Sequence, residues 1–568
     1  MTDSILTGRI AQLRQHRTAP LILELDLTDG VVEGRPADPV SAVLARHRLV
    51  LADVLDGLRR ASADDRVSAL VAKVGGKAMG LATVQELRAA VAAFGAAGKR
   101  TVAWAESFGE FSAGNVPYYL ATAFDTIYLQ PSGDLGLTGI AAERIFLRDA
   151  LDRLGVSFEV AKRHEYKSAA EQVTERGFSG PAREATERLF ASITEQLAAA
   201  IGQRRGLDAD QARKLIDRGP FLAAQALEAG LVDALGYRDE VYANVRKRAG
   251  KDAILLYLGR YQRSRALGER ARALPAPRRD AVALIYATGP IRRGRSGRGP
   301  LSSGGMGSDT IAAASRSAAA DPHARAIVLR VNSPGGSYVA SDTIWREVVR
   351  ARAGGTPVVV SMGDVAASGG YFIAMAADAI VAQGGTVTGS IGVLTAKPVL
   401  TEMLGKAGVT TDSIAEGDHS GMFSTLHPFS ADEWALVDRW LDHIYADFTG
   451  KVESGRHLPP ERVHELARGR VWTGADAQDR GLVDELGGLE HAASIARRRA
   501  GLPDTAPLRV YPRVRPVDRL RPPASSEGRG AAAASILAES WGPAWRLAAR
   551  AGWPSYGPLT LPGTWTFE

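Results

Sequence analysis

The sequence predicts an α/β protein made of two copies of one domain. Its 568 residues exceed the size at which a single hydrophobic core stops growing, so at least two domains are expected. Short apolar runs rich in β-branched residues alternate with helical patterns, which is typical of parallel strands joined by helices. Several of these segments recur later in the chain in the same order, which indicates an internal duplication.

The duplication is clearest at two pairs of segments. "GLVDALG" at 230–236 returns as "GLVDELG" at 481–487, an offset of 481 − 230 = 251. "YYLATAFDTIYL" at 118–129 returns as "YFIAMAADAIVA" at 371–382, an offset of 371 − 118 = 253. Two apolar segments further upstream keep the same order: 68–74 with 325–331, and 98–105 with 355–362.

One long helix is expected in each copy. In the second copy, Ser430 and Glu433 form a capping box at the start of the helix. Apolar residues then share one face at helical spacing: Val437, Leu441, Ile444 and Phe448 in the second copy, and Leu189, Ile193, Leu197 and Ile201 in the first.

These patterns divide the chain into five parts. The predicted parts are an N-terminal segment (1–19), the first repeat (20–250), an arginine-rich junction (251–279), the second repeat (280–500) and a Pro/Arg-rich, Trp-bearing tail (501–568). Within the tail, residues 531–553 are expected to form a helix with Leu537, Trp541 and Trp545 on one side. This helix would pack on the domain, contact another subunit or lie at a membrane surface.

Composition excludes several functions. The net charge of +7 is concentrated in connecting segments such as 292–299 and 512–523, without interleaved aromatic residues, so no nucleic-acid partner is expected. The chain has no cysteine, no H-E-x-x-H motif and no phosphate-binding or dinucleotide-binding glycine loop. We therefore expect no cofactor and no metal.

A cytoplasmic location is the default expectation. The first twenty residues lack a continuous apolar stretch, and the sequence nowhere contains 18 consecutive apolar residues. The arginine-rich segments also suit an anionic membrane surface, so peripheral membrane association is the second expectation.

The chemistry-bearing residues differ between the copies. Ser368, in "GDVAASGGYF", lies ten residues before Asp378, and the matching position before Asp125 is Asn115. The strand that precedes "NSPGGS" at 332–337 leads into glycines whose N–H groups suit an oxyanion hole, and the first copy lacks this order. The second copy therefore keeps a candidate nucleophile and a candidate oxyanion loop.

A base for Ser368 has to come from elsewhere, because no histidine lies within forty residues of it. The 253-residue offset places Lys167 of the first copy opposite Ser420 of the second, so the first copy keeps a lysine that the second lacks. A lysine serves as a base when burial lowers its pKa from about 10.4 toward 7 or 8, which costs roughly 4 kcal/mol. Complementary losses predict one active site that needs both copies.

These residues carry a resemblance to a known family. "RVNSPGGS" (330–337), "VAASGGYFIAMAAD" (365–378), "TGSIGV" (388–393) and "EYKSAAE" (165–171) resemble the long, two-repeat form of signal peptide peptidase A, or protease IV, across about 20–500. The resemblance implies tandem ClpP/crotonase-like domains of repeated ββα units. It also implies an ATP-independent serine endopeptidase that cleaves hydrophobic, signal-peptide-like peptides and assembles into a tetramer-like ring or dome. Membrane-bound members carry an N-terminal transmembrane anchor, and the residues before 20 are not expected to span a bilayer.

Particular roles follow from the same resemblance. Ser368 would be the nucleophile, Lys167 its general base and Ser390 the hydroxyl that orients the lysine. The N–H groups of Gly336 and Gly369 would form the oxyanion hole.

Three alternatives are weighed against this prediction. A Ser-His-Asp arrangement would need His164 or His419, but no carboxylate is placed to orient either ring. A crotonase-like acyl-CoA hydratase or isomerase typically uses a carboxylate pair, which the glycine turns here lack. A non-catalytic scaffold would explain the losses in the first copy but not their compensation in the second.

Overall fold

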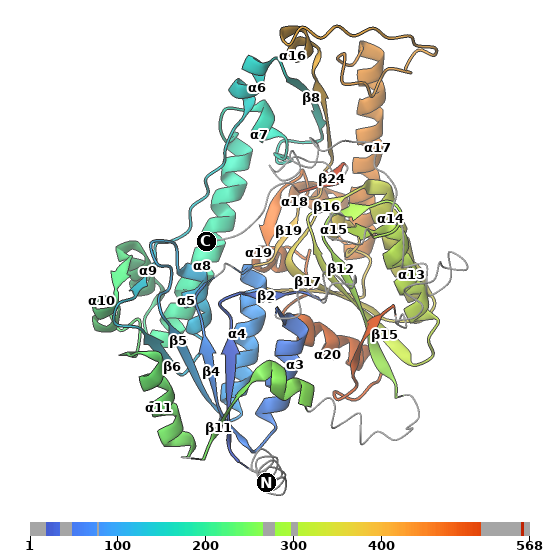
Figure 1. The fold of residues 1–568 in the computed structure, drawn as a ribbon. Coiled ribbons are helices and arrows are strands. Elements are labelled where there is room, and N and C mark those ends of the chain that lie inside the picture. Colours follow the sequence, from blue (N-terminus) through green and yellow to red (C-terminus); the bar gives the residue numbers. More distant parts are fainter. Residues whose placement is uncertain are drawn as a thin grey trace, which may run out of the picture. The chain divides into compact units, whose positions relative to one another are not determined.

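The computed structural model describes residues 19–34, 48–76, 79–250, 252–264, 279–296, 305–512 and 558–561 (Figure 1). Most of the predicted tail, including the expected helix at 531–553, lies outside these residues. By backbone contacts the chain divides into two units. Unit 1 contains residues 1–141, 193–277 and 566–568, and unit 2 contains residues 142–192 and 278–565.

Unit 1 contains a parallel sheet with the strand order β10-β6-β5-β4-β1-β11. Its strands are β1 (Leu21–Asp26), β4 (Val67–Lys73), β5 (Arg100–Ala105), β6 (Thr126–Leu129), β10 (Ala234–Leu235) and β11 (Ile254–Tyr257). Two short pairs are β2 (Val31–Val32) with β3 (Leu49–Val50), and β7 (Asp134–Leu135) with β9 (Phe221–Leu222). Its helices are α3 (Leu51–Ser62), α4 (Leu81–Ala96), α5 (Asn115–Ala121), α9 (Ala209–Arg218), α10 (Ala223–Glu228) and α11 (Arg238–Ala249).

Unit 2 repeats this sheet with the order β22-β18-β17-β15-β12-β23, and β19 and β21 extend it beside β17. Its sheet strands are β12 (Ala281–Thr288), β15 (Ala324–Ser333), β17 (Val358–Ala367), β18 (Ala379–Ala382), β19 (Val387–Gly389), β21 (Val471–Thr473), β22 (Glu485–Leu486) and β23 (Leu508–Tyr511). All neighbours are parallel except β19 and β21. Central strands buried on both faces explain the near-continuous apolar runs in the sequence.

Unit 2 also contains strands outside this sheet and ten helices with described bounds. The remaining strands are β8 (Ser157–Lys162), β13 (Ile291–Arg292), β14 (Met306–Gly307), β16 (Gly335–Gly336), β20 (Leu394–Val399) and β24 (Leu559–Thr560). The helices are α6 (Arg148–Leu154), α7 (Glu171–Thr174), α13 (Ser308–Ala319), α14 (Tyr338–Ala353), α15 (Gly369–Phe372), α16 (Thr401–Lys406), α17 (Ala431–Arg456), α18 (Pro460–Leu466), α19 (Gly474–Asp479) and α20 (Leu489–Arg499).

The predicted long helices are α8 (Gly180–Arg205) and α17. The capping box expected at the start of α17 is present: the Ser430 hydroxyl accepts from the Glu433 N–H, and the Glu433 carboxylate accepts from the Ser430 N–H. Val437, Leu441 and Phe448 are buried as predicted, and Ile444 packs partly buried against the same core.

The contact-based units differ from the predicted repeat boundaries in two respects. Both sheets use an edge strand, β11 or β23, that follows the predicted end of its repeat at 250 or 500. Residues 142–192 belong by sequence to the first repeat but group with unit 2. The physical reason is a six-residue antiparallel ladder between β8 and β20, which runs from Ser157 with Val399 to Lys162 with Leu394.

None of the helices in the described part of the chain is both long and apolar enough to cross a bilayer.

Candidate active site

Ser368 lies at a sharp turn between β17 and α15. Its backbone has φ 56° and ψ −116°, a conformation that side-chain-bearing residues rarely adopt and that costs about 1–3 kcal/mol. The turn is held from both sides, since the Ser368 N–H donates to the Gly389 carbonyl at 2.8 Å and the Ser368 carbonyl accepts from the Phe372 N–H at 2.9 Å. Strain of this kind is characteristic of functional residues whose surroundings fix them in place.

The glycines after Ser368 are required by packing. A Cβ on Gly369 would lie 2.8 Å from the Ser341 hydroxyl oxygen, and one on Gly370 would lie 2.6 Å from the Ser333 carbonyl oxygen. The "ASGG" sequence therefore lets this turn approach the loop after β15. Close packing and a role in the site therefore both account for Gly369 and Gly370.

Lys167 reaches the turn from the segment that follows β8. Besides the β8–β20 ladder, Arg163 fastens this segment to α17 through ion pairs with Asp438 and Asp442 at 3.0 and 2.5 Å. Further along, Arg188 pairs with Asp476 at 2.8 Å. These contacts lie within unit 2, so Lys167 and Ser368 belong to the same compact unit.

The Lys167 amine is buried and makes three polar contacts. Its Nζ lies 2.8 Å from Ser368 Oγ, 3.0 Å from Ser390 Oγ and 3.0 Å from the Ser390 carbonyl oxygen. Burial lowers the pKa of Lys167 from 10.5 to about 7. A neutral amine has one lone pair and two N–H groups, which match one hydroxyl donor, Ser368, and two acceptors on Ser390.

Ser390 is also held in the left-handed region, with φ 51°. Its N–H donates to the Arg470 carbonyl at 2.7 Å, which ties it to the loop before β21. This conformation presents both the carbonyl and the hydroxyl of one residue to the lysine amine. Ser390 thus has the geometry of a positioning residue.

The glycine loop after β15 lies next to Ser368. Gly335 and Gly336 have φ of 98° and 154°, and the Gly335 N–H donates to the Ser333 hydroxyl at 3.1 Å. A Cβ placed on Gly369 would lie 3.1 Å from the Gly336 nitrogen, so the N–H groups of Gly336 and Gly369 are neighbours. The N–H groups of Gly336 and Gly369 suit an oxyanion hole. The Gly335 N–H does not, because it already donates to Ser333.

The two histidines weighed as alternative bases have other surroundings. The His164 ring packs against Tyr445 and His464, with centroids 4.6 and 5.2 Å away, and His419 is exposed. Glu165 forms an ion pair with Arg468.

Tyr166 donates its hydroxyl hydrogen to Glu184 at 2.8 Å. Glu165 and Tyr166, which flank the lysine on its N-terminal side, therefore hold the segment in place.

Two glycines that sequence reasoning missed border the lysine. A Cβ on Gly469 would lie 2.5 Å from the Lys167 nitrogen, and one on Gly392 would lie 3.3 Å from Lys167 Cδ. Gly469 also has φ 87°. Gly392 lies within the "TGSIGV" motif and Gly469 within "ARGR", and a glycine in such a sequence is too common to single either one out.

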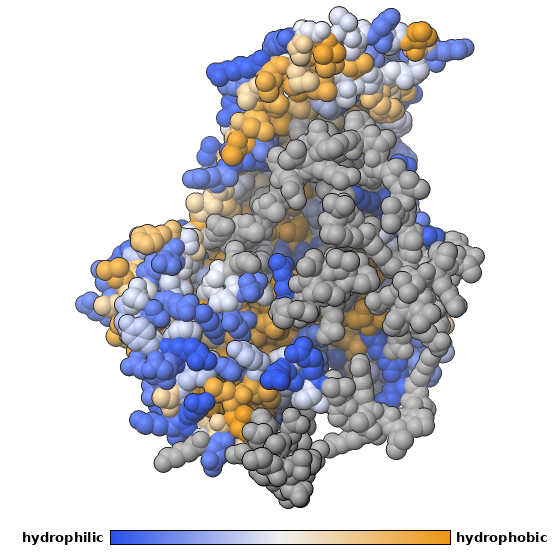
Figure 2. Space-filling model, viewed as in Figure 1, coloured by the Kyte–Doolittle hydropathy of each residue, from blue (hydrophilic) through white to orange (hydrophobic). Residues whose placement is uncertain are grey.

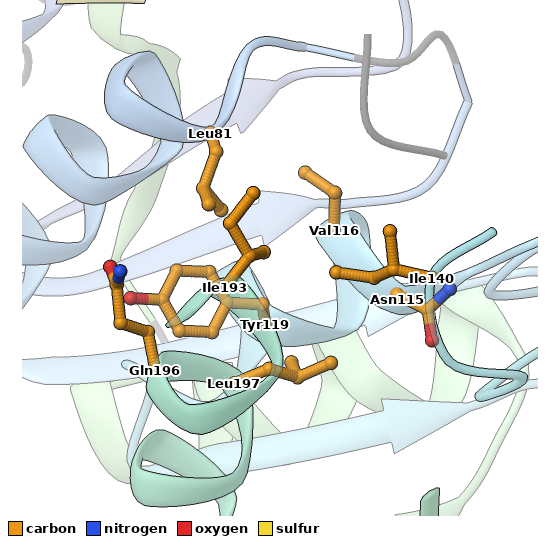
Figure 3. Close-up of a pocket in the computed structure, with 8 residues that line it drawn as sticks. All are labelled: Leu81, Asn115, Val116, Tyr119, Ile140, Ile193, Gln196 and Leu197. Atoms are coloured by element: carbon orange, nitrogen blue, oxygen red, sulfur yellow. The ribbon is translucent and has the colours of Figure 1, made fainter. Parts of the chain in front are cut away.

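The position in unit 1 that corresponds to Ser368 carries a different side chain. Asn115 begins α5 as Ser368 precedes α15, and its side-chain oxygen accepts from the N–H groups of Thr138 and Gly139, each at 3.1 Å. Figure 3 shows Asn115 beside Val116 and Ile140 at the edge of a small, mainly apolar pocket. The position of Ser390 is taken by buried Leu137, since 390 − 253 = 137.

A serine hydroxyl held against a buried lysine amine whose pKa is about 7, beside two backbone N–H groups, defines the chemical class of a serine hydrolase with a lysine base. In the described residues, no three His, Asp or Glu side chains gather as metal ligands would.

Comparisons with known proteins identify the family. Residues 93–252 and 350–503 match Peptidase family S49. The chain is 32% identical over 460 residues to the chloroplastic serine protease SPPA of Arabidopsis thaliana, covering 80% of this chain and 66% of that protein. It is 32% identical over 461 residues to Protease 4 of Salmonella typhi, covering 80% of this chain and 72% of that protein.

Among solved structures, a ClpP1 mutant from Listeria monocytogenes aligns with 37% of this chain and 94% of its own, at 14% identity and a TM-score of 0.24.

The chain therefore belongs to peptidase family S49, in its long, two-repeat form. The two matched segments and the two mainly parallel sheets confirm the predicted class of duplicated α/β domains. Membership also confirms the predicted serine-protease class. The acyl-CoA enzyme and the non-catalytic scaffold are not favoured.

Proposed function

We propose that Ser368 and Lys167 carry out ATP-independent endoproteolysis of apolar peptides. The observation that carries this proposal is the 2.8 Å contact between Lys167 Nζ and Ser368 Oγ inside a buried site where the pKa of the lysine is about 7. The chain spans 66% of the chloroplastic relative's length, so its substrates are argued from its own residues.

The mechanism follows from the positions of the groups. The neutral Lys167 amine takes the Ser368 proton as Oγ attacks the peptide carbonyl, and the N–H groups of Gly336 and Gly369 stabilise the oxyanion. The lysine ammonium then protonates the leaving amine. A water molecule, activated by the neutral amine, hydrolyses the acyl-enzyme and restores Ser368. Ser390 holds the amine in place through both of its oxygens.

Apolar substrates are proposed because the surroundings of Ser368 are apolar. Ala366, Ala367, Ile391 and Val393 are buried beside Ser368 and Ser390 in the chain. Signal-peptide-like segments fit this chemistry. The cytoplasmic or peripheral membrane location and the lack of a nucleic-acid partner stay predictions from the sequence.

A fluorogenic peptide with an apolar residue before the cleaved bond tests the proposal. Wild type should cleave it without ATP, and Ser368→Ala should not. Addition of water to an enoyl-CoA by the wild type, with no peptide cleavage, would instead favour the acyl-CoA alternative.

We also propose that copies of the chain assemble through two segments that correspond, at the 253-residue offset, to β20 and β8. The 253-residue offset relates β20 to 141–146 and β8 to 410–415, and neither counterpart forms a strand in the single chain. Ile145 and Ile414 in these counterparts are 72% and 102% exposed. Figure 2 shows hydrophobic surface at this end of unit 2, over α6 and α16.

Residues 410–415 of one chain would pair with 141–146 of the next, as β8 pairs with β20. A head-to-tail contact of this kind closes into a ring when the rotation permits, in line with the predicted tetramer-like ring or dome. Ile414→Glu should lower the mass measured by light scattering to that of a smaller species. Val510→Glu, at an exposed position on β23, is the matched control and should leave the mass unchanged. An unchanged mass for Ile414→Glu would contradict this contact.

A further inference from the structure

Gly469 and Arg470, in the loop between α18 and β21, connect the segment that carries Lys167 with Ser390. The Arg470 carbonyl accepts from the Ser390 N–H at 2.7 Å, and the Gly469 N–H donates to the Ile391 carbonyl at 2.8 Å. The backbone of Lys167 lies against the same loop, because a Cβ on Gly469 would lie 2.5 Å from the Lys167 nitrogen. One short loop therefore contacts both the proposed base and the residue that holds its amine.

The side chain of Arg470 reaches the residue that precedes Lys167. Its guanidinium lies over the Tyr166 ring, with 5.0 Å between the guanidinium carbon and the ring centroid. Its Nη1 pairs with Glu184 Oε1 at 2.8 Å and lies 3.4 Å from the Tyr166 hydroxyl oxygen. That hydroxyl donates to the other Glu184 oxygen at 2.8 Å. Arg470 thus holds Tyr166 both by stacking and through a shared carboxylate.

A second aromatic ring holds the Arg470 guanidinium. The guanidinium carbon is 4.5 Å from the centroid of Trp472, a buried residue whose indole N–H donates to the Leu466 carbonyl at 3.0 Å. Arg480 lies over the same ring at 4.2 Å and pairs with buried Asp476 at 3.6 Å. The Arg470 side chain is itself only 18% exposed. A stacked and largely buried guanidinium is held more firmly than one in an exposed ion pair.

We propose that Arg470 is a positioning residue, which keeps the Lys167 amine and Ser390 aligned for the reaction. Its side chain holds the lysine segment through Tyr166, and its carbonyl holds Ser390. The two ends of one residue thus fix both partners of the 3.0 Å contact between Lys167 Nζ and Ser390 Oγ. This inference rests on the proposed peptidase function and adds a residue on which its rate depends.

Arg470→Met tests the proposal, because it keeps a long side chain but loses the guanidinium. With the lysine segment held less firmly, kcat for the fluorogenic peptide should fall about 10-fold while KM stays nearly unchanged. The burial that lowers the pKa of Lys167 should also decrease. The pH midpoint for labelling of Ser368 by a fluorophosphonate should therefore rise by about one pH unit above that of the wild type. A role in stability alone would leave this midpoint unchanged.

Glu184→Gln is a second variant, which decides the question if Arg470→Met fails to fold. The Glu184 side chain is 56% exposed, so the change should affect folding little. It weakens the link between Arg470 and Tyr166, and kcat should fall about 3-fold. The double variant should have the same kcat as Arg470→Met alone, because both changes break the same link.

Arg462→Met is the matched control. Arg462 lies on α18, shortly before the loop, and forms an ion pair with Glu465 at 2.6 Å. Its substitution should leave kcat, KM and the labelling midpoint unchanged. A fall in kcat equal to that of Arg470→Met would show that loss of any arginine in this region slows the enzyme, and would overturn the specific role of Arg470.

The outcomes separate the two proposals. If the wild type hydrolyses the peptide, a folded Arg470→Met with the wild-type kcat and midpoint overturns the positioning role alone. Wild-type values in Glu184→Gln, or losses of kcat that multiply in the double variant, overturn it as well. A wild type that neither hydrolyses the peptide nor reacts with the fluorophosphonate overturns the peptidase function, and with it this role.

Discussion

The two repeats share a hydrogen-bond framework that the sequence offset describes well. In unit 1 the Tyr118 hydroxyl donates to the Leu231 carbonyl at 2.7 Å, and in unit 2 the Tyr371 hydroxyl donates to the Leu482 carbonyl at 3.0 Å. The offsets are 371 − 118 = 253 and 482 − 231 = 251, the same two values as in the sequence repeat. A buried tyrosine thus connects the same elements in both units.

A carboxylate has the same role in each unit. Asp233 accepts from the Ile127 N–H at 2.7 Å, and Asp484 accepts from the Ile380 N–H at 2.7 Å. Each also pairs with arginine at the end of the long helix, α8 or α17. These groups support the parallel sheet and are common to both copies.

The two copies differ at the residues of the candidate active site. Ser368 and Ser390 in unit 2 correspond to Asn115 and Leu137 in unit 1, and the Asn115 amide is used to hold its own loop. The duplicated framework is therefore separable from the site. We infer that the first repeat keeps the fold and supplies Lys167, while the second supplies the nucleophile.

The largest expected effect is on the reacting pair. Ser368→Ala and Lys167→Met should each lower kcat/KM for peptide hydrolysis at least about 10³-fold, because the nucleophile or its base is lost. Asn115→Ser in the Ser368→Ala background should restore nothing, since the Lys167 amine contacts Ser368 and Ser390. Steady-state kinetics on the fluorogenic peptide measure both. Recovery of activity would contradict the division of roles.

A smaller effect is expected at Ser390. Ser390→Ala removes one of two acceptors for the Lys167 amine but leaves the carbonyl, so kcat should fall about 10- to 100-fold with KM nearly unchanged. Leu137→Ala, at the matching buried position of unit 1, should lower stability with little change in kcat. Equal loss of kcat in both variants would argue against a positioning role for Ser390.

The smallest effect tests the shared framework. Asp233→Ala and Asp484→Ala each leave a backbone N–H without its carboxylate partner and should lower the free energy of unfolding by about 1–3 kcal/mol. Chemical denaturation monitored by circular dichroism measures both. A large loss in one repeat and none in the other would show that the framework is not shared.

Much of this arrangement could be predicted from the sequence. The repeat gave the order of strands and helices in both copies, and the complementary positions of Ser368 and Lys167 predicted their pairing. The capping box at Ser430 predicted the start of α17. These features are local, or are repeated within the chain.

Other features could not be predicted, because they depend on long-range packing. The β8–β20 ladder, which groups Lys167 with unit 2, joins segments with no periodic signal to mark their pairing. The roles of Gly392 and Gly469 depend on how closely other backbone passes. The pairing of β24 with β16 involves a segment that is too short to carry a sequence pattern.

The most direct test of the Ser368–Lys167 pair is the pH dependence of the rate at which a fluorophosphonate labels Ser368. Burial lowers the pKa of Lys167 to about 7, so the amine is mainly charged below this pH and mainly neutral above it. Only the neutral amine accepts the serine proton. The rate should rise with pH to a plateau, with a midpoint near 7, and Lys167→Met should lose this dependence. A midpoint near 10.5, or a wild-type profile retained in Lys167→Met, would contradict the account.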